Sequence, residues 1–140
     1  MRFHPFRPLS RIARTWFLAL TAAFLVTTLP AEEIPVGSPL RKQLFDSIRA
    51  QAEKAAKSPV KFLGSLRQDA GWAVFTGEVV GPDGKSLPVG DAESSDTFAL
   101  WQKKGDSWKL IEFSAGHTDA FYENYPAEYG VPKALLFPEN

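Results

Sequence analysis

The sequence predicts a single α+β domain: an N-terminal amphipathic helix packed on a four-stranded antiparallel sheet, then a short C-terminal helix and an irregular tail. Apolar residues recur every four positions over residues 39–57, and from Val60 their period changes to two. Short turns rich in glycine, aspartate and proline separate the alternating stretches. With 140 residues, the chain is long enough for one core and little else.

Residues 1–31 have the pattern of a signal peptide. Four arginines and no acidic residue precede an apolar run from Trp16 to Leu29. As a helix this run would be about 21 Å long, which is short for a bilayer core of about 30 Å. The small side chain of Ala31 places the expected cleavage before Glu32. We therefore expect a periplasmic or secreted protein without a stable membrane span after cleavage, and an uncleaved N-terminal anchor is the alternative.

Composition narrows the function classes. The chain has no cysteine, which excludes a disulfide scaffold, a thiol nucleophile and a zinc knuckle. Without the four N-terminal arginines, residues 32–140 carry 12 basic and 16 acidic side chains, a net charge of −4. That acidity argues against a nucleic-acid partner. No glycine-rich phosphate loop follows a predicted strand, so no nucleotide and no other cofactor is expected.

The predicted domain covers residues 38–140, and residues 32–37 are expected to be a tether because they include Pro35 and Gly37. Ser38 is a typical N-cap before a proline at the first helical position. The predicted helix then runs over 39–57 and ends before Ser58-Pro59. Its apolar face holds Leu40, Leu44, Phe45, Ile48, Ala52 and Ala56.

Four strands are expected after the helix. The first begins at Val60, and a three-residue loop, Asp69–Gly71, leads into the second at Trp72–Val80. After a polar loop over 85–95, the third (97–104) and fourth (108–115) strands join through the two-residue turn Gly105-Asp106. Thr118 is a candidate cap for a final helix over 119–125. Pro126, Gly130 and Pro132 are expected to keep the tail irregular.

These loop lengths predict which residues share a face of the sheet. They pair Leu66 with Val74, Leu100 with Ile111, and Phe98 with Phe113. One face is then expected to hold Val60, Phe62, Leu66, Trp72, Val74 and Val80, and the other Leu63, Phe75 and Val79. In the hairpin of the third and fourth strands, Trp101 is expected across from Leu110 and Trp108 across from Lys103. These residues share the face opposite Phe98 and Leu100. Neither face is polar, although one helix covers only one of them.

Two interpretations of the second face remain open. The aromatic C-terminal segment folds back and fills it, or part of it stays open as a pocket or partner site. In the second case the expected binding residues are Trp101, Trp108, Phe75, Tyr122 and Tyr125. Tryptophans on strands are more often core residues than stacking platforms, so packing is the competing interpretation for Trp72, Trp101 and Trp108.

Catalytic and metal-binding chemistry has little support. His117 is the single histidine after residue 31, and as a general base it would be oriented by Asp119. No nucleophile elbow surrounds Ser94, Ser95 or Ser114, so a structural histidine is the simpler interpretation. An acidic loop carries Asp83, Asp91, Glu93 and Asp96, but its spacing does not match a calcium-binding loop, and no metal site is expected.

Six short segments follow one another in a recognisable order: Gly37-Ser38-Pro39-Leu40-Arg41-Lys42, the stretch Leu66–Phe75, Trp108-Lys109-Leu110-Ile111, Gly116-His117-Thr118-Asp119, Tyr122-Glu123 and Tyr129-Gly130. Together they resemble small exported bacterial proteins of unknown function. The element order is also similar to cystatin-like and NTF2-like α+β folds. The resemblance implies export and a small α+β fold, and it implies no activity.

These observations favour a non-catalytic binding module for a small apolar molecule, an envelope component or a protein partner. The alternative is a small NTF2-like hydrolase or isomerase with His117 as general base and Asp119 as its orienter. A structural or inhibitory partner of another envelope protein is a third hypothesis.

Overall fold

The computed structural model describes residues 31–139, so the predicted signal peptide lies outside the described residues except for Ala31. Five strands and three helices follow one another in the described part. They are β1 (Glu32–Glu33), α1 (Pro39–Ala56), β2 (Lys61–Asp69), β3 (Trp72–Val80), β4 (Asp96–Lys104), β5 (Ser107–Ala115), α2 (Tyr125–Tyr129) and α3 (Lys133–Leu136). The fold is therefore α+β, with five strands instead of the predicted four. Among residues 31–139, no helix is long and apolar enough to cross a membrane.

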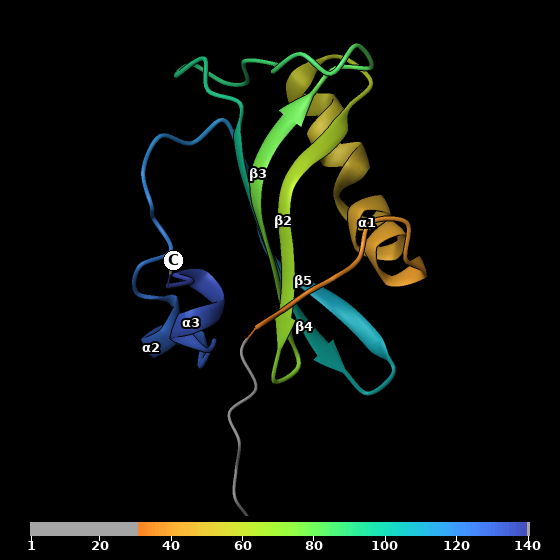
Figure 1. Cartoon of the computed structure of the whole chain (residues 1–140). Helices are drawn as coiled ribbons and strands as arrows, with labels where there is room; N and C mark the ends of the chain where they lie inside the picture. The colour runs from red at the N-terminus through yellow and green to blue at the C-terminus, as the bar shows by residue number, and fades with distance from the viewer. Residues whose placement is uncertain (1–30, 140) are drawn as a thin grey trace, which may run out of the picture.

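The strands form one antiparallel meander in the order β1-β2-β3-β4-β5, and it separates two layers. Helix α1 lies on one side of the sheet and the short helices α2 and α3 lie on the other (Figure 1). We call these two sides the helix face and the C-terminal face. Each has its own buried cluster, so the sheet is covered on both sides.

Helix α1 forms where the sequence predicts it and ends one residue earlier, at Ala56. The Ser38 side chain caps the first turn by accepting a hydrogen bond from the Arg41 amide. Leu44, Phe45 and Ile48 are buried against the sheet. Phe45 stacks on Phe62, with ring centroids 4.8 Å apart. The Trp101 indole donates to Ser47 Oγ at 2.9 Å, so its one polar atom is satisfied on the helix face.

The β2–β3 hairpin differs from prediction by one residue. Asp69 pairs with Trp72, so the loop is Ala70-Gly71, and both residues adopt positive φ angles of 49° and 80°. Such backbone angles suit a two-residue hairpin turn, although alanine adopts them reluctantly. Leu66 therefore pairs with Phe75 and not with Val74.

This change of register moves side chains between faces. Phe62 and Leu66 lie on the helix face with Phe75, whereas Trp72 and Val74 lie on the C-terminal face. The predicted grouping of these residues was therefore wrong.

The β4–β5 hairpin follows the prediction near its turn and departs from it further on. Lys103 pairs with Trp108 and Trp101 with Leu110, as predicted. The register then shifts between Leu100 and Trp101, so that Leu100 pairs with Glu112 and Phe98 with Ser114. The predicted pairs of Leu100 with Ile111 and Phe98 with Phe113 were wrong, because Ile111 is an extra residue in the ladder, a β-bulge.

Both ends of the described chain are more ordered than the sequence suggests. Residues 32–37 include β1, which pairs with β2, and Ile34 is fully buried, so this segment is not simply a tether. The helix predicted over 119–125 is absent, and α2 begins at Tyr125 instead. Pro126 occupies its first turn, which accepts proline, and Gly130 ends it at a φ of 77°. The residues expected to break structure thus set the ends of a helix.

Candidate functional site

A cavity of about 540 Å³ lies at the side of the C-terminal face, where the C-terminal residues meet β2. We call it the C-terminal pocket. It is lined by Ala31, Arg67, Lys133, Ala134, Phe137, Pro138 and Glu139. Four of these seven residues are apolar, and the other three are the charged residues Arg67, Lys133 and Glu139. A cavity of this size is in the range of small-molecule sites, about 300–1,000 Å³.

Arg67 is held in place from both sides. Its Nη2 donates to the Leu135 carbonyl at 2.7 Å, and its Nη1 donates to Ser65 Oγ at 3.2 Å. Its Nε–H is buried and has no hydrogen-bond partner among the described residues. Burial lowers the pKa of Arg67, and Glu33 partly opposes this effect. An arginine remains protonated at neutral pH, so the pocket contains a fixed and poorly solvated cation.

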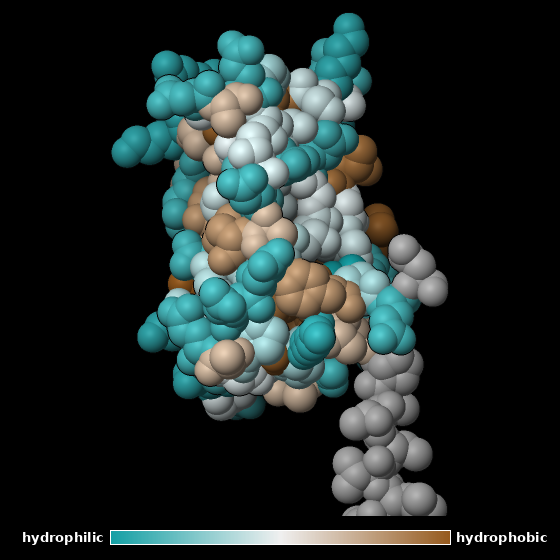
Figure 2. All heavy atoms as spheres, turned by 90° about the vertical axis from the view of Figure 1, so that its left-hand side faces the viewer, coloured by the Kyte–Doolittle hydropathy of each residue, from teal (hydrophilic) through white to brown (hydrophobic). Residues whose placement is uncertain are grey.

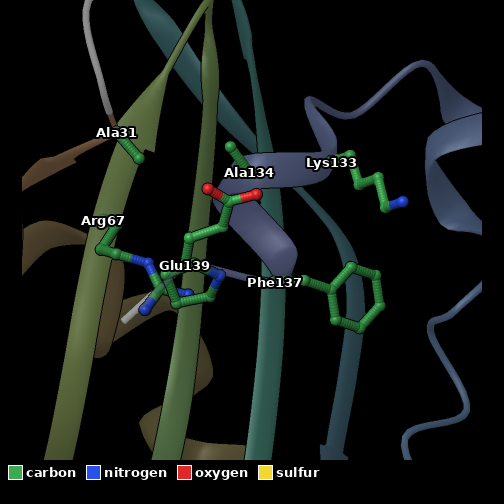
Figure 3. A pocket seen from close by; sticks show the side chains of 7 residues that line it. Ala31, Arg67, Lys133, Ala134, Phe137 and Glu139 are labelled. Atoms are coloured by element: carbon green, nitrogen blue, oxygen red, sulfur yellow. The ribbon is translucent and has the colours of Figure 1, made fainter.

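The other charged groups are at the exposed edge of the pocket. Figure 3 shows Arg67 reaching from β2 toward the C-terminal segment, with Glu139 in front of it. The Lys133 and Phe137 side chains lie on the opposite side and point away from Arg67. Within residues 31–139, no carboxylate lies within ion-pair distance of Arg67. The guanidinium is therefore not neutralised by a direct partner in this part of the chain.

The rest of the C-terminal face is closed by aromatic rings. Phe98 is 1% exposed and stacks on Tyr122 with ring centroids 4.3 Å apart. Phe121 and Tyr125 contact the same ring edge-on. Burial and the neighbouring Glu112 raise the pKa of Tyr125 to about 12. Seen from outside, brown and tan apolar side chains on this side are interrupted by teal polar ones (Figure 2).

The five residues predicted to bind a ligand do not share one surface. Phe75 and Trp101 are 0% exposed on the helix face, where nothing outside the protein reaches them. Trp108 is half-buried and lines a separate hollow of about 340 Å³ beside the β2–β3 turn. Tyr122 and Tyr125 pack in the cluster of the C-terminal face. The C-terminal aromatic segment thus fills most of the C-terminal face, with the pocket at its edge, whereas α1 covers the face that holds Phe75 and Trp101.

His117 and Asp119 are not joined by a hydrogen bond. The His117 ring packs edge-on against Phe121, with centroids 5.1 Å apart, and its Nδ1 is buried without a hydrogen-bond partner among the described residues. Its backbone carbonyl accepts a hydrogen bond from Ser94 Oγ at 2.8 Å. Asp119 is exposed. The ring therefore packs against Phe121, and no carboxylate of residues 31–139 orients it.

The acidic loop between β3 and β4 is organised by hydrogen bonds. Glu78 accepts from Ser86 and Ser95, at 2.6 and 2.9 Å, which lowers the pKa of its carboxyl group. Asp83 accepts from the Lys85 amide and so shapes the turn. No three histidine, cysteine or acidic side chains come close enough to hold a metal ion in the part of the chain that the structure describes.

Arg67 was missed because its position depends on one loop residue. With the predicted three-residue loop, the Arg67 side chain would lie on the other side of the sheet from Trp72 and Val74. The observed loop places it across from Val74, on the C-terminal face. Arg67 follows Leu66 but stands among the polar residues Ser65, Gln68 and Asp69, so nothing in the local sequence set it apart.

Comparisons with known proteins found no matching family model, no matching curated protein and no matching solved structure.

Proposed function

We propose that this protein is a non-catalytic, exported binding module that takes up a small molecule with an apolar body in the C-terminal pocket. The observation that carries the proposal is the cavity of about 540 Å³, with apolar walls and the half-buried Arg67 at one side. Small-molecule sites commonly combine an apolar lining with a few fixed polar groups. The catalytic alternative has no comparable support, because His117 lacks a carboxylate partner among the described residues.

A neutral fluorescent probe tests this proposal. N-phenyl-1-naphthylamine brightens in apolar sites, so we expect its fluorescence to rise when the protein is added. Ala134 lines the pocket and is exposed, so Ala134→Trp fills the cavity at little cost to the core. We expect this variant to lose most of the fluorescence gain.

Ala50→Trp is the matched control, because Ala50 is equally exposed on the outer surface of α1. It should bind the probe like the unmodified protein. If both tryptophan variants bind equally well, or if the unmodified protein does not bind the probe, the pocket is not a binding site. Circular dichroism of both variants shows whether the fold is retained.

Export is the second part of the proposal and rests on the arginine-rich, apolar pattern of residues 1–31. Expression in a bacterial host and intact-mass measurement should give a periplasmic or secreted chain that begins at Glu32. Recovery of the complete chain from the cytoplasm would contradict export.

A further inference from the structure

We infer that the ligand of the C-terminal pocket carries a carboxylate on an apolar body, and that Arg67 binds this carboxylate. The inference rests on the proposed function, because it names the chemistry of the molecule that the same pocket would hold.

The first support is the unused hydrogen-bonding capacity of Arg67. A guanidinium has five N–H donors, and the bonds to Leu135 and Ser65 account for two of them. The Nε–H is buried without an acceptor, and an unsatisfied buried donor is unfavourable. Because protein atoms enclose the Nε–H, the donors left for a molecule in the pocket are the two remaining Nη hydrogens.

The second support is that the guanidinium is fixed before any ligand arrives. Leu135 lies in α3 and Ser65 lies in β2, so the two hydrogen bonds hold the group between two elements. A planar guanidinium held in one orientation suits a planar carboxylate, to which it donates two parallel hydrogen bonds. Little side-chain entropy then remains to be lost on binding.

The third support is the charge balance. Arg67, Lys133 and Glu139 are the charged residues of the lining, which gives the lining itself a net charge of +1. Glu33 acts on Arg67 from outside the lining through Ser65. Burial of Arg67 lowers its pKa, so its charge is poorly solvated and gains from a counter-ion. A single negative charge matches this lining better than a phosphate dianion does. Cleavage before Glu32 would remove Ala31 from the lining, and the apolar walls of Ala134, Phe137 and Pro138 would cover the remainder of the molecule.

Competition between two ten-carbon probes tests the inference. Decanoate and decanol share an alkyl chain and differ in the carboxylate, and both are used below the concentration at which decanoate forms micelles. Each is titrated against protein loaded with N-phenyl-1-naphthylamine. We expect decanoate to displace the dye at about a tenfold or greater lower concentration than decanol, because hydrogen bonds to charged groups are the stronger ones.

Two substitutions make the test specific. Arg67→Met keeps an unbranched side chain and removes the charge, so it should weaken decanoate binding far more than decanol binding and abolish the preference for decanoate. Glu139→Gln removes the negative charge from the edge of the pocket and should tighten decanoate binding alone. The ratio of the two affinities is the readout, because a purely structural loss would weaken both probes together. Should Arg67→Met fail to fold, Arg67→Lys and Glu139→Gln carry the test.

The outcomes separate this inference from the proposed function. Equal displacement by decanoate and decanol in the unmodified protein overturns the carboxylate inference and leaves the binding pocket intact. Dye binding that neither probe displaces also overturns the inference. Absence of dye binding overturns the proposed function, and the inference falls with it.

Discussion

The two faces of the sheet are closed by different means. On the helix face, one helix of 18 residues covers an apolar cluster that contains Phe75 and Trp101. On the C-terminal face, two helices of five and four residues and a run of aromatic side chains cover the apolar cluster. A long helix satisfies its own backbone and presents a continuous apolar stripe, whereas short helices do neither. We therefore expect the helix face to carry most of the stability and the C-terminal face to carry the binding site.

The arrangement of polar side chains supports the same division. The buried polar atom of Trp101 on the helix face is paired with Ser47. On the C-terminal face, Arg67 keeps a buried N–H without a described partner. Incompletely satisfied polar groups lower stability, and they are tolerated where they serve a purpose such as binding.

The largest expected effect is on the helix face. Trp101→Ala removes a fully buried indole together with its hydrogen bond to Ser47. We expect it to lower the free energy of unfolding by about 4–5 kcal/mol, measured by urea denaturation. Trp108→Ala is the control, because Trp108 is only half-buried, and its cost should be about 1–2 kcal/mol. If the two variants lose the same free energy of unfolding, burial of Trp101 on the helix face does not dominate the stability.

A smaller and more local effect is expected for Phe98→Ala on the C-terminal face. Phe98 lies beneath Phe121, Tyr122 and Tyr125, so its removal leaves a cavity under the aromatic segment. We expect a loss of about 3 kcal/mol. Amide hydrogen exchange should accelerate over residues 119–139 more than over α1. Uniform acceleration would mean that the two faces unfold as one unit.

Arg67→Met should cost less again. It removes the hydrogen bonds that connect β2 to Leu135 in α3, and these are worth about 1–3 kcal/mol. The free energy of unfolding and the exchange of the α3 amides are the measurements. Arg67→Lys keeps the charge but has a single donor group, so its free energy of unfolding should lie between those of Arg67→Met and the unmodified protein. A stabilised Arg67→Met would show that the buried Nε–H costs more than the two hydrogen bonds contribute.

The smallest expected effect is a pH dependence of the C-terminal face. The pKa of Tyr125 is about 12 in the folded protein and about 10 in an unfolded chain. Between these values the unfolded state binds fewer protons, so stability falls as pH rises from about 10 to 12. We expect this residue to make the decline steeper.

The Tyr125→Phe variant isolates this contribution, since other groups also titrate in that range. The unmodified protein should lose stability faster than the variant above pH 10. Parallel declines in the two proteins would contradict a raised Tyr125 pKa.

Helix α1 and the four long strands follow directly from sequence periodicity. The Ser38-Pro39 cap and the four-residue apolar repeat are local signals, and the strands alternate within their own boundaries. Strand β1 was missed because two residues carry no period and pair only through contacts distant in sequence. Helix α2 was displaced because Pro126 was interpreted as a breaker, whereas proline also suits a first helical turn.

The candidate site depended on register, which a sequence specifies less directly. One alanine in a left-handed conformation, Ala70, shortened the first loop and moved Arg67 to the other face. One bulge at Ile111 changed the partners of Phe98 and Leu100. The pocket itself forms only when α3 packs beside β2, so its lining residues come from three separate parts of the chain.

Hydrogen exchange with and without decanoate tests the central claim most directly, that one face stabilises the protein and the other binds. With decanoate present, we expect slower exchange in α3 and in the amides around Arg67, with the exchange of α1 unchanged. Ala134→Trp should show no such slowing. Slowing confined to α1, or the same slowing over both faces, would contradict the assignment of binding to the C-terminal face.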